Sequence, residues 1–144
     1  MAGKRLNVTR REFLDSYRRH YKLYKSTNGN NKARRLLLFY SVECGLKSLM
    51  MKNFGKSNFE EFESYCVNSN KRNLTGHDIK AMLKEINPTH TFFLQNINLK
   101  KGGSVQPGRF NELWRYGVTV ADIQQEECAE NTLKKIAEWI DTRV

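Results

Sequence analysis

The sequence predicts an all-α protein, an up-and-down bundle of about five helices with one irregular excursion near residues 89–117. Apolar side chains recur at spacings of three and four along most of the chain, which is the repeat of an amphipathic helix. Only two prolines occur in 144 residues, so long stretches are open to helix formation. The stretches between the periodic segments are short, and no internal repeat is visible. We therefore expect residues 1–144 to form a single helical domain.

The first helix is expected over residues 9–26. Its apolar face is made by Phe13, Leu14, Tyr17, Tyr21 and Tyr24. A basic stripe lies on the flank of that face and consists of Arg10, Arg11, Arg18, Lys22 and Lys25. Tyrosine at the edge of a buried face can stack on an exposed nucleobase, although packing in the core is the simpler use.

The central helix is expected over residues 32–53, where apolar residues occur nearly all round the helix. Gly55 is in the position of a helix C-terminal glycine. A short helix follows, capped by Ser57-Asn58 and running to about Cys66.

A further helix is predicted to begin at Thr75, because Thr75 and Asp78 have the spacing of a capping box, and to run to Ile86. Residues 89–109 are the least regular part of the chain. They form either a short strand pair or, more simply, a mobile basic loop. A helical turn is expected over 110–116 and a last helix over 120–141, with Ile123 on its inward face.

The net charge of +10 is concentrated at the N-terminal end. Residues 1–35 hold eleven Lys and Arg against two acidic residues, a balance of 11 − 2 = +9. Such a surface attracts polyanions, so RNA, DNA or an acidic protein is the expected partner, and a merely solvated helix face is the alternative. The residues expected to bind nucleic acid are the basic stripe Arg10, Arg11, Arg18, Lys22 and Lys25, together with Lys100, Lys101, Arg109 and Arg115. For Arg115 the alternative is stacking on its aromatic neighbours.

We expect a soluble, cytoplasmic protein that does not enter a membrane. No apolar stretch approaches the length of a membrane span, and residues 1–8 lack the apolar core of a secretory signal. Cys44, Cys66 and Cys128 are too few and too widely spaced for a disulfide framework or a zinc site, so we expect reduced packing residues. The acidic cluster at 60–63 has no accompanying histidine, and neither a metal nor another cofactor is expected.

Arg72, Asn73 and His77 have the residue types of a minimal ribonuclease site. A guanidinium can hold a phosphodiester, an amide can position it, and a neutral imidazole can take a proton from a ribose 2′-hydroxyl. The expected products are a cyclic phosphate and a free 5′-hydroxyl, with no metal required. The competing interpretation is that Arg72 is a surface charge and His77 only occupies a helix start.

Three segments resemble the HEPN superfamily, the higher-eukaryote and prokaryote nucleotide-binding domains. They are residues 35–47, residues 76–83, which begin with Gly-His-Asp-Ile, and residues 112–117, which read Glu-Leu-Trp-Arg-Tyr-Gly. The resemblance implies a helical bundle that commonly forms homodimers. Its ribonuclease members carry an arginine, a polar residue, a short spacer and a histidine, the order found at Arg72, Asn73 and His77. The spacer here is one residue shorter than is usual in the family.

Two functions follow as hypotheses. The first is an RNA-directed protein of a bacterial defence or toxin–antitoxin system, acting as a metal-independent endoribonuclease through Arg72, Asn73 and His77. The second is a non-catalytic module that docks a partner enzyme, such as a nucleotidyltransferase, or nucleic acid through the basic stripe.

Overall fold

The computed structural model describes residues 6–29 and 31–144 and confirms a mostly helical bundle. The six α-helices are α1 (Arg10–Ser26), α2 (Lys32–Phe54), α3 (Phe59–Asn68), α4 (Ile79–Ile86), α5 (Phe110–Tyr116) and α6 (Ile123–Asp141). Of two 3₁₀ turns, η1 (Arg72–Thr75) precedes α4 and η2 (Pro107–Arg109) leads directly into α5. A two-stranded antiparallel sheet pairs β1 (Ile97–Asn98) with β2 (Ser104–Val105).

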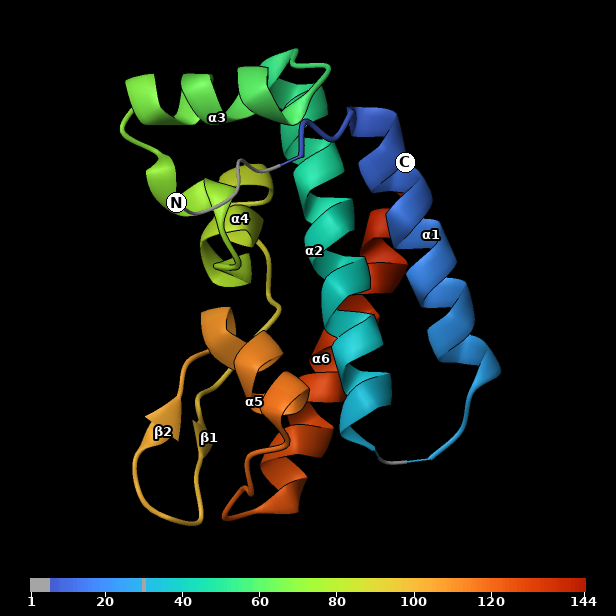
Figure 1. The fold of residues 1–144 in the computed structure, drawn as a ribbon, viewed down its shortest axis with the longest axis vertical. Coiled ribbons are helices and arrows are strands. Elements are labelled where there is room, and N and C mark those ends of the chain that lie inside the picture. Colours follow the sequence, from blue (N-terminus) through green and yellow to red (C-terminus); the bar gives the residue numbers. More distant parts are fainter. Residues whose placement is uncertain (1–5, 30) are drawn as a thin grey trace.

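Helix α2 is the central element of the bundle, as its apolar composition predicts. It lies between α1 on one side and α4 and α5 on the other, with α6 packed against it and α3 across its end (Figure 1). Fully buried side chains along its length include Leu38, Phe39, Val42, Leu46 and Met50. A helix surrounded in this way must be apolar on most of its faces, which explains why its sequence shows little amphipathic character.

Local capping signals define the ends of the first two helices close to where the sequence places them. The Thr9 hydroxyl accepts from the Glu12 backbone N–H at 3.1 Å, and the Glu12 side chain accepts from the Thr9 N–H at 2.9 Å. Gly55 ends α2 with a φ of 68°, a conformation that glycine adopts without strain. Asn58 caps α3, also as predicted.

The predicted helix start at Thr75 is wrong. The Thr75 hydroxyl donates to the Arg72 carbonyl at 2.7 Å within η1, and α4 begins four residues later, at Ile79. Asp78 is the N-cap, because its carboxylate accepts from the Ala81 N–H at 3.1 Å. Both residues can cap a helix, and the 3₁₀ turn at 72–75 leaves only Asp78 available for the role.

Three other expectations need revision. The stretch at 89–109 contains the strand pair rather than only a loop, with Lys100 and Lys101 in its turn. Ile123 is 54% exposed at the first turn of α6, so it does not face inward. Cys128 is exposed and is therefore not a packing residue, whereas Cys66 is buried and all three thiols are free, as expected.

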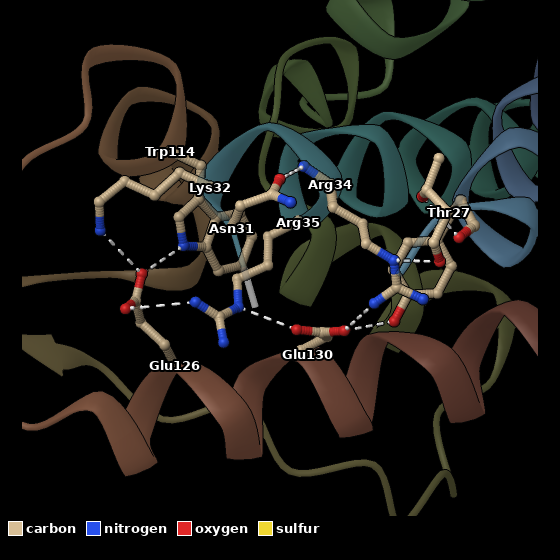
Figure 2. Close-up of polar contacts among 9 residues, drawn as sticks. Thr27, Asn31, Lys32, Arg34, Arg35, Trp114, Glu126 and Glu130 are labelled. Carbon is tan, nitrogen blue, oxygen red and sulfur yellow. Dashed lines mark hydrogen bonds and ion pairs between the residues drawn. The ribbon is translucent and has the colours of Figure 1, made fainter. Parts of the chain in front are cut away.

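A buried ion network that the sequence analysis did not foresee joins α2 to α6. Figure 2 shows Arg35 of α2 between two carboxylates of α6, at 3.4 Å from Glu126 and 2.9 Å from Glu130. Lys32 pairs with Glu126 at 3.3 Å, and Arg34 with Glu130 at 3.0 Å. The indole N–H of Trp114 donates to Glu126 and the Tyr24 hydroxyl donates to Glu130. The network ties four helices, α1, α2, α5 and α6, together at one end of the bundle.

No helix in residues 6–29 and 31–144 is both long and apolar enough to cross a bilayer.

Candidate functional site

Arg72, Asn73 and His77 line one open pocket of about 710 Å³. Its walls come from η1, the loop at 76–78, the first turn of α4, Asn96 and η2. The structure therefore brings the three predicted catalytic residues to a common surface. It also adds Arg109 from η2, which the sequence placed only in a basic loop, and Lys80 from α4.

The pocket carries a surplus of positive charge. Three cationic side chains line it, from Arg72, Lys80 and Arg109, against one carboxylate, that of Asp78. The Asp78 carboxylate accepts a backbone hydrogen bond as the α4 N-cap. The Arg72 and Lys80 side chains make no ion pair with any described residue, whereas Arg109 pairs with Glu112. The charge of this surface is therefore complementary to an anionic group.

His77 precedes α4 and does not lie in its first turn. Asp78, the N-cap, stands between His77 and the first helical residue, Ile79. The backbone at 77–78 is instead held against η2. A Cβ on Gly108 would lie 3.4 Å from the Asp78 Cα and 3.7 Å from the His77 carbonyl oxygen. These are ordinary van der Waals distances, so the two segments lie side by side at this point.

The His77 ring is oriented by Glu43 of α2. His77 Nδ1 lies 2.6 Å from Glu43 Oε1, and Lys47 Nζ donates to Glu43 Oε2 at 3.0 Å. Burial raises the pKa of the Glu43 carboxyl, but the hydrogen bonds and charges of His77 and Lys47 outweigh burial and hold that pKa below its ordinary value. Glu43 is therefore an ionised acceptor.

The protonation of Glu43 determines the tautomer of His77. A carboxylate can only accept, so the proton at this contact is on Nδ1 and the neutral ring carries its lone pair on Nε2. The His77 side chain is 51% exposed while that of Glu43 is 10% exposed. The ring is thus fixed at its buried nitrogen and open to a substrate at the other, the arrangement that a general base requires.

The basic stripe is separate from this pocket. Arg10, Arg11, Arg18, Lys22 and Lys25 are all exposed on α1, and α2 lies between α1 and α4 (Figure 1). Lys100 and Lys101 are exposed in the β1–β2 turn, and Arg115 is exposed on α5 with its guanidinium 5.9 Å from the Tyr116 ring centroid. Of the nine residues expected to bind nucleic acid, Arg109 lines the pocket.

Lys4 and Arg5, which contribute to the N-terminal charge, lie outside the described residues. So does most of the segment 1–8, which we compared with a secretory signal.

The tyrosines of α1 belong to the core. Tyr17, Tyr21 and Tyr24 are between 0% and 6% exposed. The Tyr17 hydroxyl donates to the Asp141 carboxylate at 2.6 Å. Their rings are therefore closed to a nucleobase.

Glu43 and Lys47 are the site residues that the sequence analysis missed. They sit four residues apart within the apolar run of α2, and both are buried. Burying a charged side chain costs free energy unless it is paired. A glutamate and a lysine four residues apart in an apolar helix can pair, so their spacing could have identified them as a buried pair. Their third partner, His77, is thirty-four residues from Glu43, a separation that no local pattern spans.

No group of three or more His, Cys, Asp or Glu side chains within the described ranges is arranged to hold a metal ion.

Searches with family models, against curated proteins and against solved structures gave no match.

Proposed function

We propose that this protein is a HEPN-like endoribonuclease that cuts RNA without a metal ion. The observation that carries the proposal is the His77–Glu43 hydrogen bond at the edge of a basic pocket. This arrangement supplies a histidine whose tautomer is fixed, which can act as a base, beside cationic side chains that can bind a phosphate. Arg72 and Asn73, the other two residues of the motif, line the same pocket. They lie in η1, whereas His77 lies in the loop that follows it.

The reaction uses the substrate's own hydroxyl as nucleophile. His77 Nε2 takes the proton of a ribose 2′-hydroxyl, and the 2′-oxygen attacks the adjacent phosphorus. A P–O2′ bond forms as the P–O5′ bond breaks, and the 5′-oxygen takes a proton from solvent. His77 then returns its proton to solvent. Arg72 stabilises the extra negative charge on the phosphoryl oxygens, and Asn73 orients the phosphodiester.

Glu43 acts through His77 as a positioning residue. It holds the ring and favours the imidazolium that forms as the 2′-proton is taken. Replacement by glutamine keeps the side-chain shape but removes the charge. We therefore expect Glu43→Gln to lower the cleavage rate and shift its pH dependence, with less effect on RNA affinity.

The test is cleavage of labelled RNA in EDTA by the parent protein and by His77→Ala. General base catalysis is typically worth about 10²- to 10⁴-fold, so the variant should lose at least about 100-fold in rate. The matched control is His20→Ala on α1, a histidine whose ring contacts Ser16. It should cut as the parent does.

The products distinguish this mechanism from contamination. Cuts should leave 2′,3′-cyclic phosphates, and DNA of the same sequence should remain intact because it lacks the nucleophile. Equal cleavage by the parent and His77→Ala, each checked for folding by circular dichroism, would refute the assignment.

The separate position of the basic stripe favours a second candidate, a docking module. A polyanion or a partner enzyme on α1 would not need to reach His77. In that case Arg18→Glu with Lys22→Glu abolishes association, while His77→Ala leaves it unchanged. A partner nucleotidyltransferase belongs to this second candidate. A homodimer and a role in a defence or toxin–antitoxin system are proposed for the ribonuclease, on the resemblance to the HEPN superfamily.

A further inference from the structure

A second pocket, of about 400 Å³, adjoins the basic pocket, and Asn96 lines both of them. Residues 93–96, in the segment before β1, form one of its walls. The other wall comes from residues 122–129, at the start of α6. We name it the amide pocket after four lining residues that carry a side-chain amide, which are Gln95, Asn96, Gln124 and Gln125.

Phe93 gives the amide pocket an exposed aromatic ring on a backbone that is held in place. Its side chain is 71% exposed, whereas the next residue, Leu94, is buried in the core. The Thr132 hydroxyl of α6 donates to the Phe93 carbonyl at 3.3 Å. Farther along the segment, the Asn98 N–H donates to the side-chain oxygen of Gln125 at 2.8 Å. An exposed ring on an anchored backbone offers a face on which a flat ligand can stack.

The amides supply hydrogen-bond donors and acceptors beside that ring. Among residues 6–29 and 31–144, the side chains of Gln95, Asn96 and Gln124 have no hydrogen-bond partner, whereas the Gln125 oxygen is taken by Asn98. Each free amide has an oxygen that accepts and an NH₂ group that donates. A nucleobase carries donors and acceptors around its edge and can pair with such groups. An apolar side chain of a protein partner would leave them unpaired, which costs free energy.

The charges of the two pockets match the two parts of an RNA strand. Arg72, Lys80 and Arg109 line the basic pocket, where a phosphate would lie. No lysine or arginine of the described ranges lines the amide pocket. Its one carboxylate, from Asp122, accepts from the Gln124 N–H at 2.9 Å as the N-cap of α6. This pocket therefore disfavours a phosphate and accepts a neutral base.

We infer that the amide pocket binds an unpaired nucleobase of the RNA whose phosphodiester lies in the basic pocket. Phe93 stacks on the face of the base, and the free amides bond to its edge. The inference rests on the proposed function in taking the ligand to be RNA. All four bases have a flat face, and an amide can donate or accept, so the pocket recognises a single strand rather than one base. A base within a duplex is paired at its edge and stacked on its faces, so it does not enter.

Binding of an uncleavable strand tests the pocket without requiring cleavage. The probe is a short fluorescein-labelled 2′-O-methyl oligouridine, and its control is an abasic strand with the same number of phosphates. Stacking on an aromatic side chain predicts that the oligouridine binds about fivefold or more tighter than the abasic strand in fluorescence anisotropy. Phe93→Ala should reduce this ratio to near one, and Phe93→Tyr should preserve it. The matched control is Tyr116→Ala, which removes an exposed ring that lines neither pocket and should leave the ratio unchanged.

Cys128 supplies a second measurement, because its exposed thiol lines the same pocket. Saturating oligouridine should slow the reaction of Cys128 with a thiol reagent, and the abasic strand should not. An unchanged rate with oligouridine bound would mean that the bases lie elsewhere and would overturn the inference. Circular dichroism establishes that each variant is folded.

Cleavage assays on the same variants separate this inference from the proposed function. RNA cleavage that requires His77, together with equal binding of the oligouridine and the abasic strand, would overturn the inference and leave the ribonuclease intact. Oligouridine binding that depends on Phe93 and protects Cys128 would support the amide pocket, even if no RNA were cut and the ribonuclease proposal failed. No measurable binding of either strand would refute the pocket.

Discussion

Replacing Arg35 with methionine should be among the most destabilising single changes in this protein. Arg35 is 2% exposed and is the only cation that contacts both Glu126 and Glu130 in the described part of the chain. Methionine preserves much of the side-chain volume but leaves two buried carboxylates short of a partner. Glu126 keeps Lys32 at 3.3 Å, and Glu130 keeps Arg34 at 3.0 Å.

The magnitude follows from these remaining contacts. Removing one member of a buried ion pair costs about 3–5 kcal/mol when the other charge is left uncompensated. Because each carboxylate here keeps one cation, the loss should lie near the lower end, at about 3 kcal/mol. For a chain of this length that corresponds to a fall in melting temperature of roughly 10 °C.

Urea denaturation followed by far-ultraviolet circular dichroism measures the free energy of unfolding of the parent and of Arg35→Met. The matched control is Arg19→Met on α1, an exposed arginine whose loss should change stability by less than about 0.5 kcal/mol. A loss below about 1 kcal/mol for Arg35→Met would refute the reasoning. It would mean that the cost of burying the guanidinium cancels its attraction to the carboxylates. One guanidinium nitrogen has no hydrogen-bond partner among residues 6–29 and 31–144.

Three further predictions follow from the packing and ionisation of the chain. A Cβ on Gly45 would lie 2.9 Å from side-chain carbons of Tyr17 and Ile140, so Gly45→Ala should destabilise the bundle by about 1–2 kcal/mol in thermal unfolding, even though alanine favours helices. Although burial opposes ionisation of Glu43, the contacts with His77 and Lys47 lower its pKa below the ordinary 4.5. Its ionised form therefore contributes stability above about pH 4.5, and the advantage of the parent over Glu43→Gln should shrink as the pH falls below that value. Cys128 is the exposed cysteine, so a thiol reagent should titrate one thiol rapidly in the native protein and three after denaturation.

Much of the bundle could be predicted from the sequence because its helices carry their own signals. The apolar repeat of 9–26 and the glycine at 55 depend on neighbours within a few residues, and α1 and the end of α2 lie close to their predicted places. The error at Thr75 has the same local origin. Two capping residues three positions apart compete there, and the choice depends on whether residues 72–75 form a 3₁₀ turn.

The candidate site was predictable only in part. Arg72, Asn73 and His77 are close in sequence, so a short motif can include them, whereas Arg109 and Glu43 come from segments more than thirty residues away from His77. Their approach depends on how η2 and α2 pack against the loop at 76–78. A linear pattern carries no information on such packing between distant segments.

Chain composition and local periodicity therefore specify an all-α protein with a basic N-terminal helix and a histidine that follows an arginine. The packing of the helices determines which of these charges work together. It buries Arg35 between two glutamates and places Glu43 behind His77, while α2 separates the basic stripe from the pocket. These outcomes depend on long-range contacts, because pairing and desolvation of a charge are set by what lies beside it in space.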